Sequence, residues 1–155
     1  MSITSENRKP WRKPATFAFA GLVIALVAGC GDGRPSRVPV SGRVLIDGQP
    51  LESGNIRVHA AANRAASGKI EADGRFTLST YEFGDGVVVG QHPVTVTGSK
   101  LLNSQTMRWY APKKYASGES SGLTLDISEP TDAAEINLSW EGGKPFDERI
   151  IGGGD

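Results

Sequence analysis

The chain has 155 residues, which is enough for one domain with a single hydrophobic core. Its 17 basic and 17 acidic residues give a formal net charge of zero, and one cysteine excludes a scaffold held together by internal disulfides. The abundance of glycine and proline (20 and 9 residues) favours short strands and turns over long helices.

The N-terminus combines a basic segment with a short apolar one. Arg8, Lys9, Arg12 and Lys13 precede a stretch over residues 15–28 that is apolar apart from one threonine. This stretch is shorter than the roughly 20 residues needed to cross a bilayer, and its length is ordinary for the apolar part of a signal peptide. It ends just before Cys30, the single cysteine.

The sequence Val27-Ala28-Gly29-Cys30 resembles the lipobox of bacterial lipoproteins. This resemblance implies a lipoprotein signal peptide over residues 1–29, acyl chains such as palmitate on Cys30, and a tether over residues 30–37. Several acyl chains anchor a protein stably in a membrane. Gly31 follows the cysteine where aspartate would retain a lipoprotein at the inner membrane, so we expect the cell envelope, with the outer membrane favoured and the domain facing the periplasm or the surface. An ordinary secretory signal with an incidental cysteine, or a short buried helix, are the alternatives.

The chain that remains after cleavage before Cys30 is mildly acidic. It has 126 residues, of which 13 are basic and 16 acidic, because the leader contains four basic residues and one acidic residue. A net charge of −3 is poorly suited to phosphate backbones, so nucleic acid is excluded as a partner.

Short alternating segments predict β structure in the rest of the chain. Apolar residues alternate with polar ones in several segments, and Asp47-Gly48 and Asp73-Gly74 supply hairpin turns between them. About seven such strands, each with one apolar face, predict two packed antiparallel sheets. We expect residues 99–122 to form a long connection and residues 141–155 to form a flexible C-terminal tail.

Several of these segments are similar to the carboxypeptidase regulatory-like domain. The motifs are Val40-Ser41-Gly42-Arg43-Val44, Asp47-Gly48-Gln49-Pro50-Leu51, Gly54-Asn55-Ile56-Arg57-Val58 and the segment from Gly68 to Leu78. Later segments resemble the small Planctomycetes lipoproteins that contain this domain. The resemblance implies an all-β, seven-stranded transthyretin-like (prealbumin-like) sandwich over residues 38–140, and it carries almost no information on activity.

The sequence contains few residues in patterns typical of a catalytic or metal site. The hydroxyisourate hydrolases of transthyretin-like fold end in a Tyr-Arg-Gly-Ser motif and use clustered histidines, whereas this chain contains only His59 and His92 and ends in Gly-Gly-Gly-Asp. A zinc site needs three or four clustered ligands, and Asp73 and Asp85 lie in glycine turns without a calcium-loop pattern. We therefore expect no enzyme activity, no metal and no cofactor.

One segment mixes aromatic and basic residues in a way typical of contact surfaces. The candidate binding residues are Arg108, Trp109, Tyr110, Lys113, Lys114 and Tyr115. They form either a stacking surface for a sugar, a peptide or a protein, or a cover over the open end of the sandwich with the lysines in water; the second interpretation is favoured.

The sequence thus predicts a non-enzymatic, lipid-anchored cell-envelope module for binding or scaffolding. Its partners are the membrane, through the lipid on Cys30, and an envelope protein or polysaccharide. The alternative is an accessory carbohydrate- or peptide-binding domain that acts beside a separate envelope enzyme.

Overall fold

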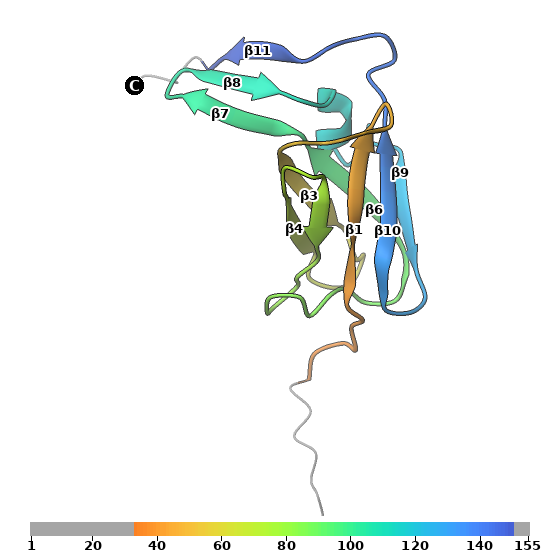
Figure 1. The fold of residues 1–155 in the computed structure, drawn as a ribbon. Helices are drawn as coiled ribbons and strands as arrows, with labels where there is room; N and C mark the ends of the chain where they lie inside the picture. Colours follow the sequence, from red (N-terminus) through yellow and green to blue (C-terminus); the bar gives the residue numbers. More distant parts are fainter. Residues whose placement is uncertain (1–32, 151–155) are drawn as a thin grey trace, which may run out of the picture. The chain divides into compact units, whose positions relative to one another are not determined.

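The computed structural model describes residues 33–150, and these residues form an all-β fold (Figure 1). The prediction of a signal peptide and of lipidation at Cys30 concerns residues that lie outside the described range. Within this range, no helix has the length and apolar character needed to span a membrane. The strands are β1 (Val40–Ile46), β2 (Gln49–Pro50), β3 (Gly54–Val58), β4 (Ala66–Ile70), β5 (Arg75–Thr77), β6 (Gly90–Thr97), β7 (Ser99–Asn103), β8 (Thr106–Trp109), β9 (Leu123–Ile127), β10 (Thr131–Leu138) and β11 (Phe146–Arg149), with a 3-10 helix, η1, at Lys113–Ala116.

The first sheet is built around β1, which pairs with β10, β2 and β5. Strands β2 and β5 run antiparallel to β1, but β10 runs parallel to it, with Val44 opposite Ile136. The expectation of purely antiparallel sheets is wrong for this pair. The strands from β2 to β9 all lie between β1 and β10 in the chain, so the two are not joined by a hairpin, and a connection of this length permits the parallel pairing.

The second sheet has the order β4-β3-β6-β9 and is antiparallel throughout. Its strands follow the predicted alternation, since Ile56 and Val58 on β3 and Val94 and Val96 on β6 are all buried. Apolar residues of both sheets and of the segments between them form one hydrophobic cluster, in which Phe76 and Leu78 are buried, as we expected for Phe76.

The turn at Asp73-Gly74 forms as predicted, with φ of 79° at the glycine. The two strands that flank it do not form a regular hairpin, because β4 pairs with β3 whereas β5 pairs with β1. An isolated bridge between Ser67 and Ser79 and a hydrogen bond of 2.9 Å from the backbone N–H of Glu71 to the carbonyl of Arg75 link the two sides. The turn therefore carries the chain from one sheet to the other.

The third sheet occupies segments for which the sequence predicted a long connection and a flexible tail. Strand β6 is followed after Gly98 by β7, which folds back as β8, and β11 pairs antiparallel with β8. This sheet, in the order β11-β8-β7, extends from one end of the domain (Figure 1). The expected connection at 99–122 thus contains two strands and η1. The expected tail contains the strand β11, whose aromatic and acidic side chains lie opposite the aromatic and basic side chains of β8.

Candidate functional site

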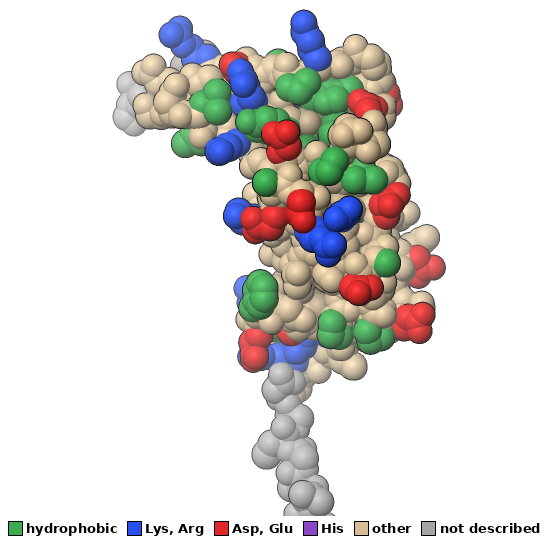
Figure 2. Space-filling view, in the orientation of Figure 1, with side chains coloured by type: hydrophobic (Ala, Val, Ile, Leu, Met, Phe, Trp, Pro, Cys, Tyr) green, Lys and Arg blue, Asp and Glu red, His purple; other side chains and the backbone are tan. Residues whose placement is uncertain are grey.

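The six candidate binding residues lie on β8 and on the turn that follows it. Arg108 and Trp109 end β8, Tyr110 follows directly, and the remaining three belong to η1. Figure 2 shows hydrophobic side chains interspersed with lysine and arginine side chains at this end of the domain. The predicted mixture of aromatic and basic side chains is therefore brought together.

Arg108 is paired with an acidic residue of β11. Its Nε and Nη2 atoms donate hydrogen bonds of 2.6 and 2.8 Å to the two carboxylate oxygens of Asp147, directly opposite in the β8–β11 register. The hydrogen bonds, together with the charge of the partner, raise the pKa of Arg108 and lower the pKa of Asp147. This bidentate pair occupies the Nε–Nη2 edge of the guanidinium group, which is one of the edges that a carboxylate or phosphate ligand would use.

Trp109 is held by the same strand. Its Nε1 donates a hydrogen bond of 2.8 Å to Glu148, and its ring is stacked with that of Phe146, at a centroid distance of 6.4 Å and an interplanar angle of 16°. Trp140 meets Phe146 edge-on at the same centroid distance. These three rings form what we call the aromatic cluster.

Both lysines of η1 are engaged within the chain. Lys113 donates a hydrogen bond to Glu148, and its Nζ lies 5.2 Å from the centroid of the Trp109 ring. Hydrogen bonds from Lys113 and then from Trp109 lower the pKa of Glu148. Lys114 donates a hydrogen bond of 2.5 Å to Glu141, which raises the pKa of the lysine.

The two tyrosines have structural roles. Tyr115 is buried, and its hydroxyl accepts a hydrogen bond of 3.1 Å from the backbone N–H of Ser139, next to the Ser139 carbonyl at 3.3 Å. Tyr110 is partly buried against the core cluster. These residues agree with the cover interpretation, whereas the lysines are not simply solvated, because each is paired with a carboxylate.

The sequence interpretation missed the partners of this surface, which are Trp140, Glu141, Phe146, Asp147 and Glu148. Trp140 follows β10 by two residues, and the other four lie in the segment that was expected to be a tail. A signal for them was present, because Phe146-Asp147-Glu148 read backwards places a charge opposite Arg108 and a ring opposite Trp109. Cross-strand pairs of opposite charge and of aromatic rings are the units that stabilise a sheet.

An open groove of ≈ 390 Å³ lies beside this surface. Its lining includes Gln49 and Glu52 from the region of β2, together with Arg108, Tyr110 and Trp140. Two aromatic rings and several polar groups around one open groove provide both an apolar surface and hydrogen-bonding groups for a ligand.

Both histidines are engaged in contacts within the domain. Nε2 of His59 lies 3.0 Å from the hydroxyl of Thr95, and Nε2 of the buried His92 lies 2.7 Å from the carbonyl oxygen of Val88. No group of three or more histidine, cysteine, aspartate or glutamate residues that could hold a metal ion occurs among residues 33–150.

The two aspartates considered for calcium hold turns. Asp73 accepts a hydrogen bond from the backbone N–H of Arg75, and Asp85 accepts one from that of Thr80. Their carboxylates thus have the turn-forming role that is usual for aspartate in such loops.

No family model, curated protein or solved structure matches the chain. The resemblance to the carboxypeptidase regulatory-like domain therefore rests on the sequence motifs alone and stays a prediction.

Proposed function

We propose that the protein is a non-enzymatic, lipid-anchored module of the cell envelope that binds or scaffolds other envelope components. The observation that carries the proposal is the position of Cys30, directly after an apolar segment of signal-peptide length and eight residues before Val38. In this proposal residues 1–29 are removed, Cys30 carries the acyl chains, and residues 30–37 connect the lipid to the domain.

The proposed domain is a carboxypeptidase regulatory-like sandwich of transthyretin-like topology over residues 38–140. Support comes from the two four-stranded sheets, whose buried residues form one common cluster. Strand β11 is then an addition to this sandwich.

The arrangement of the described residues suits an anchored binding module. The chain enters at Val38, which pairs with Val87, and the sheet of β7, β8 and β11 lies at the opposite end of the domain (Figure 1). An anchor at Cys30 leaves that sheet accessible to partners. The engagement of both histidines in local contacts supports the non-enzymatic assignment.

The anchor is tested by metabolic labelling with palmitate in a bacterial host. We expect the wild-type chain to be labelled and the variant Cys30→Ala to remain unlabelled, with Ser36→Ala in the tether as a labelled control. Equal labelling of wild type and Cys30→Ala contradicts the proposal.

In a Gram-negative host, Gly31→Asp tests the expected sorting to the outer membrane, and it should move the labelled protein from the outer to the inner membrane fraction. Crosslinking in native membranes followed by mass spectrometry then identifies the partner.

The alternative is an accessory carbohydrate- or peptide-binding domain, and the groove beside Tyr110 and Trp140 favours it. Titration with envelope polysaccharides, followed by tryptophan fluorescence, separates the two functions. An accessory domain should give a saturable change that Gln49→Ala in the groove weakens and Glu129→Ala, outside its lining, does not. A scaffold should give no saturable change and should retain its crosslinked protein partner.

A further inference from the structure

Phe83 is the most exposed large hydrophobic side chain among those that the structure describes, with 93% of its surface accessible. It lies in the loop between Thr80 and Gly86, where Tyr81 is also exposed. Single exposed apolar residues are common on protein surfaces and need no explanation by themselves. The structure of this loop and its position beside the tether give Phe83 a more specific meaning.

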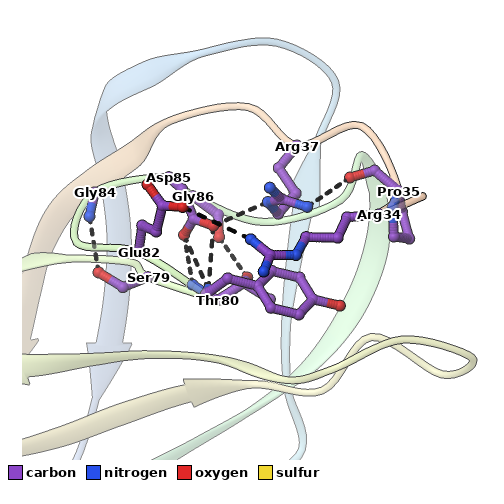
Figure 3. Close-up of polar contacts among 10 residues, drawn as sticks. Arg34, Pro35, Arg37, Ser79, Thr80, Glu82, Gly84, Asp85 and Gly86 are labelled. Carbon is purple, nitrogen blue, oxygen red and sulfur yellow. Dashed lines mark hydrogen bonds and ion pairs between the residues drawn. The ribbon is translucent and has the colours of Figure 1, made fainter. Parts of the chain in front are cut away.

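The loop is held in a defined conformation. One Asp85 oxygen accepts a hydrogen bond of 2.7 Å from the backbone N–H of Thr80, and the other accepts one of 3.1 Å from that of Tyr81. The Thr80 hydroxyl donates to the carbonyl of Gly86, and the backbone N–H of Gly84 donates to Ser79 (Figure 3). The loop therefore presents Phe83 to solvent from a fixed backbone.

The charge of Asp85 is part of this conformation. Burial raises the pKa of the carboxyl, but hydrogen bonds from three backbone N–H groups and the charge of Arg37 outweigh this effect, so the pKa lies below its ordinary value. Nε of Arg37 lies 3.0 Å from the carboxylate, in an ion pair that lacks the geometry of a hydrogen bond.

The tether runs along the same loop. Arg34 is 3.7 Å from Glu82, and the guanidinium carbons of Arg34 and Arg37 lie 4.5 and 4.7 Å from the centroid of the Tyr81 ring. Arg64 reaches the same ring at 5.4 Å. Three arginines thus lie around the Tyr81 ring, at the point where the tether meets the domain; Figure 3 shows Arg34 and Arg37 beside the loop.

The length of the tether limits how far this loop can lie from the lipid. Cys30 is four residues before Arg34, and four extended residues span at most about 14 Å. An acyl anchor on Cys30 therefore keeps the backbone of Arg34 within that range of the membrane surface, and the loop lies one side-chain contact beyond it. Because the tether is this short, a bilayer is the partner that we expect the exposed Phe83 ring to meet.

We propose that the loop from Thr80 to Gly86 is a second membrane contact, in which the Phe83 ring enters the interfacial region of the bilayer and the exposed Arg64 faces lipid phosphates. This inference rests on the proposed lipid anchor at Cys30. Aromatic and basic side chains together are typical of surfaces that bind the membrane interface. The contact fixes the orientation of the domain, so that the sheet of β7, β8 and β11 is held away from the membrane.

The test uses the full, palmitate-labelled chain in vesicles of phosphatidylethanolamine and phosphatidylglycerol. Because Cys30 is blocked by the lipid, the variant Phe83→Cys has one reactive thiol for an environment-sensitive dye, and Leu102→Cys on exposed β7 is the matched control. We expect the dye at position 83 to shift to shorter wavelength and to be quenched by brominated lipids, while the dye at position 102 does neither. In vesicles of phosphatidylcholine alone, a smaller shift identifies the phosphatidylglycerol headgroup as the arginine ligand.

Several outcomes overturn the inference. Palmitate labelling with no quenching at position 83 refutes the membrane contact and leaves the anchor intact, whereas absence of palmitate label refutes the anchor and the contact with it. Energy transfer between dyes at position 83 without lipid quenching shows that the loop contacts a second copy of the chain. Amide hydrogen exchange on vesicles tests the Phe83 side chain itself. In vesicle-bound Phe83→Ala the loop amides should exchange at least tenfold faster than in the wild type, and in Arg64→Gln the increase should be smaller.

Discussion

The variant Phe146→Ala should detach β11 from β8 while the core stays folded. Phe146 contacts two other rings of the aromatic cluster, each at a centroid distance of 6.4 Å. An aromatic pair contributes about 0.5–1.5 kcal/mol beyond its buried area, so removal of both contacts costs about 1–3 kcal/mol. A loss of about 2 kcal/mol increases the open population of β11 roughly 30-fold. Phe146 does not belong to the core cluster, so this loss should be confined to the third sheet.

Amide hydrogen exchange measures this opening residue by residue. We expect the amides of β11 and the N–H of Ile150, which donates to the carbonyl of Gln105, to exchange roughly 30-fold faster in Phe146→Ala. The buried strands β3 and β6 should exchange at the wild-type rate. Lys144→Ala, an exposed change in the segment before β11, is the control. Equal acceleration in β3 and β6 would refute the reasoning, because it would show that β11 unfolds only with the core; no acceleration in β11 would show that the ring contacts add nothing.

The other predictions concern the core and the loop at the tether. A Cβ at Gly42 would lie 1.8 Å from the carbonyl oxygen of Ala134, so Gly42→Ala should separate β1 from β10. We expect the free energy of unfolding to fall by about 3 kcal/mol or more, which lowers the Tm by roughly 10 °C in thermal denaturation. Gly118→Ala is the control and should leave the Tm unchanged, because a Cβ at that position has no atom within 4 Å. Tyr115→Phe removes a hydroxyl that accepts a backbone hydrogen bond, so the free energy of unfolding in urea should fall by about 1–2 kcal/mol, and an unchanged midpoint would contradict the role assigned to it. The stabilisation from Asp85 is complete above the ordinary pKa of 3.8 and is lost as the pH falls through its lower pKa in the folded state, so Asp85→Asn should flatten the acid branch of a stability–pH curve; a variant with the wild-type acid branch would show that Asp85 is not responsible.

The features that the sequence predicted correctly are those that depend on neighbouring residues. Alternation assigns Ile56 and Val58 to a buried face because side chains on a strand point alternately to its two sides. The turn at Asp47-Gly48 follows equally from local chemistry, since both residues adopt positive φ, which aspartate and glycine tolerate.

Strand pairing depends on residues far apart in the sequence, so local patterns did not predict which strands lie side by side. The parallel pair of β1 and β10 joins Val44 to Ile136, and nothing in either segment distinguishes a parallel neighbour from an antiparallel one. The same holds for β5, which leaves its sequence neighbour β4 to pair with β1. Alternation identifies which face of a strand is buried and does not identify the strand beside it.

The candidate surface shows how this limit affects function. Its composition predicted either a stacking surface for a sugar, a peptide or a protein, or a cover over the end of the sandwich, and in the structure the segment from Glu141 to Glu148 of the same chain supplies carboxylates and an aromatic ring to it. The residue types in a patch therefore specify the chemistry of what binds there, but not whether the binding segment belongs to another molecule. The segment after residue 140, whose glycine and proline content predicted a flexible tail, supplies the side chains that pair with this surface.

This internal pairing changes which residues an external partner can use. The charges of Arg108, Lys113 and Lys114 are already satisfied by β11 and Glu141, so a ligand that relied on them would have to replace three carboxylates. By contrast, β7 is the outer strand of the order β11-β8-β7, and its Leu101 and Leu102 are 55% and 44% exposed. An outer strand with exposed apolar side chains is a template for pairing with a strand of another chain. A protein partner of the proposed module would therefore gain more by extending this sheet at β7 than by binding the basic residues of β8 and η1.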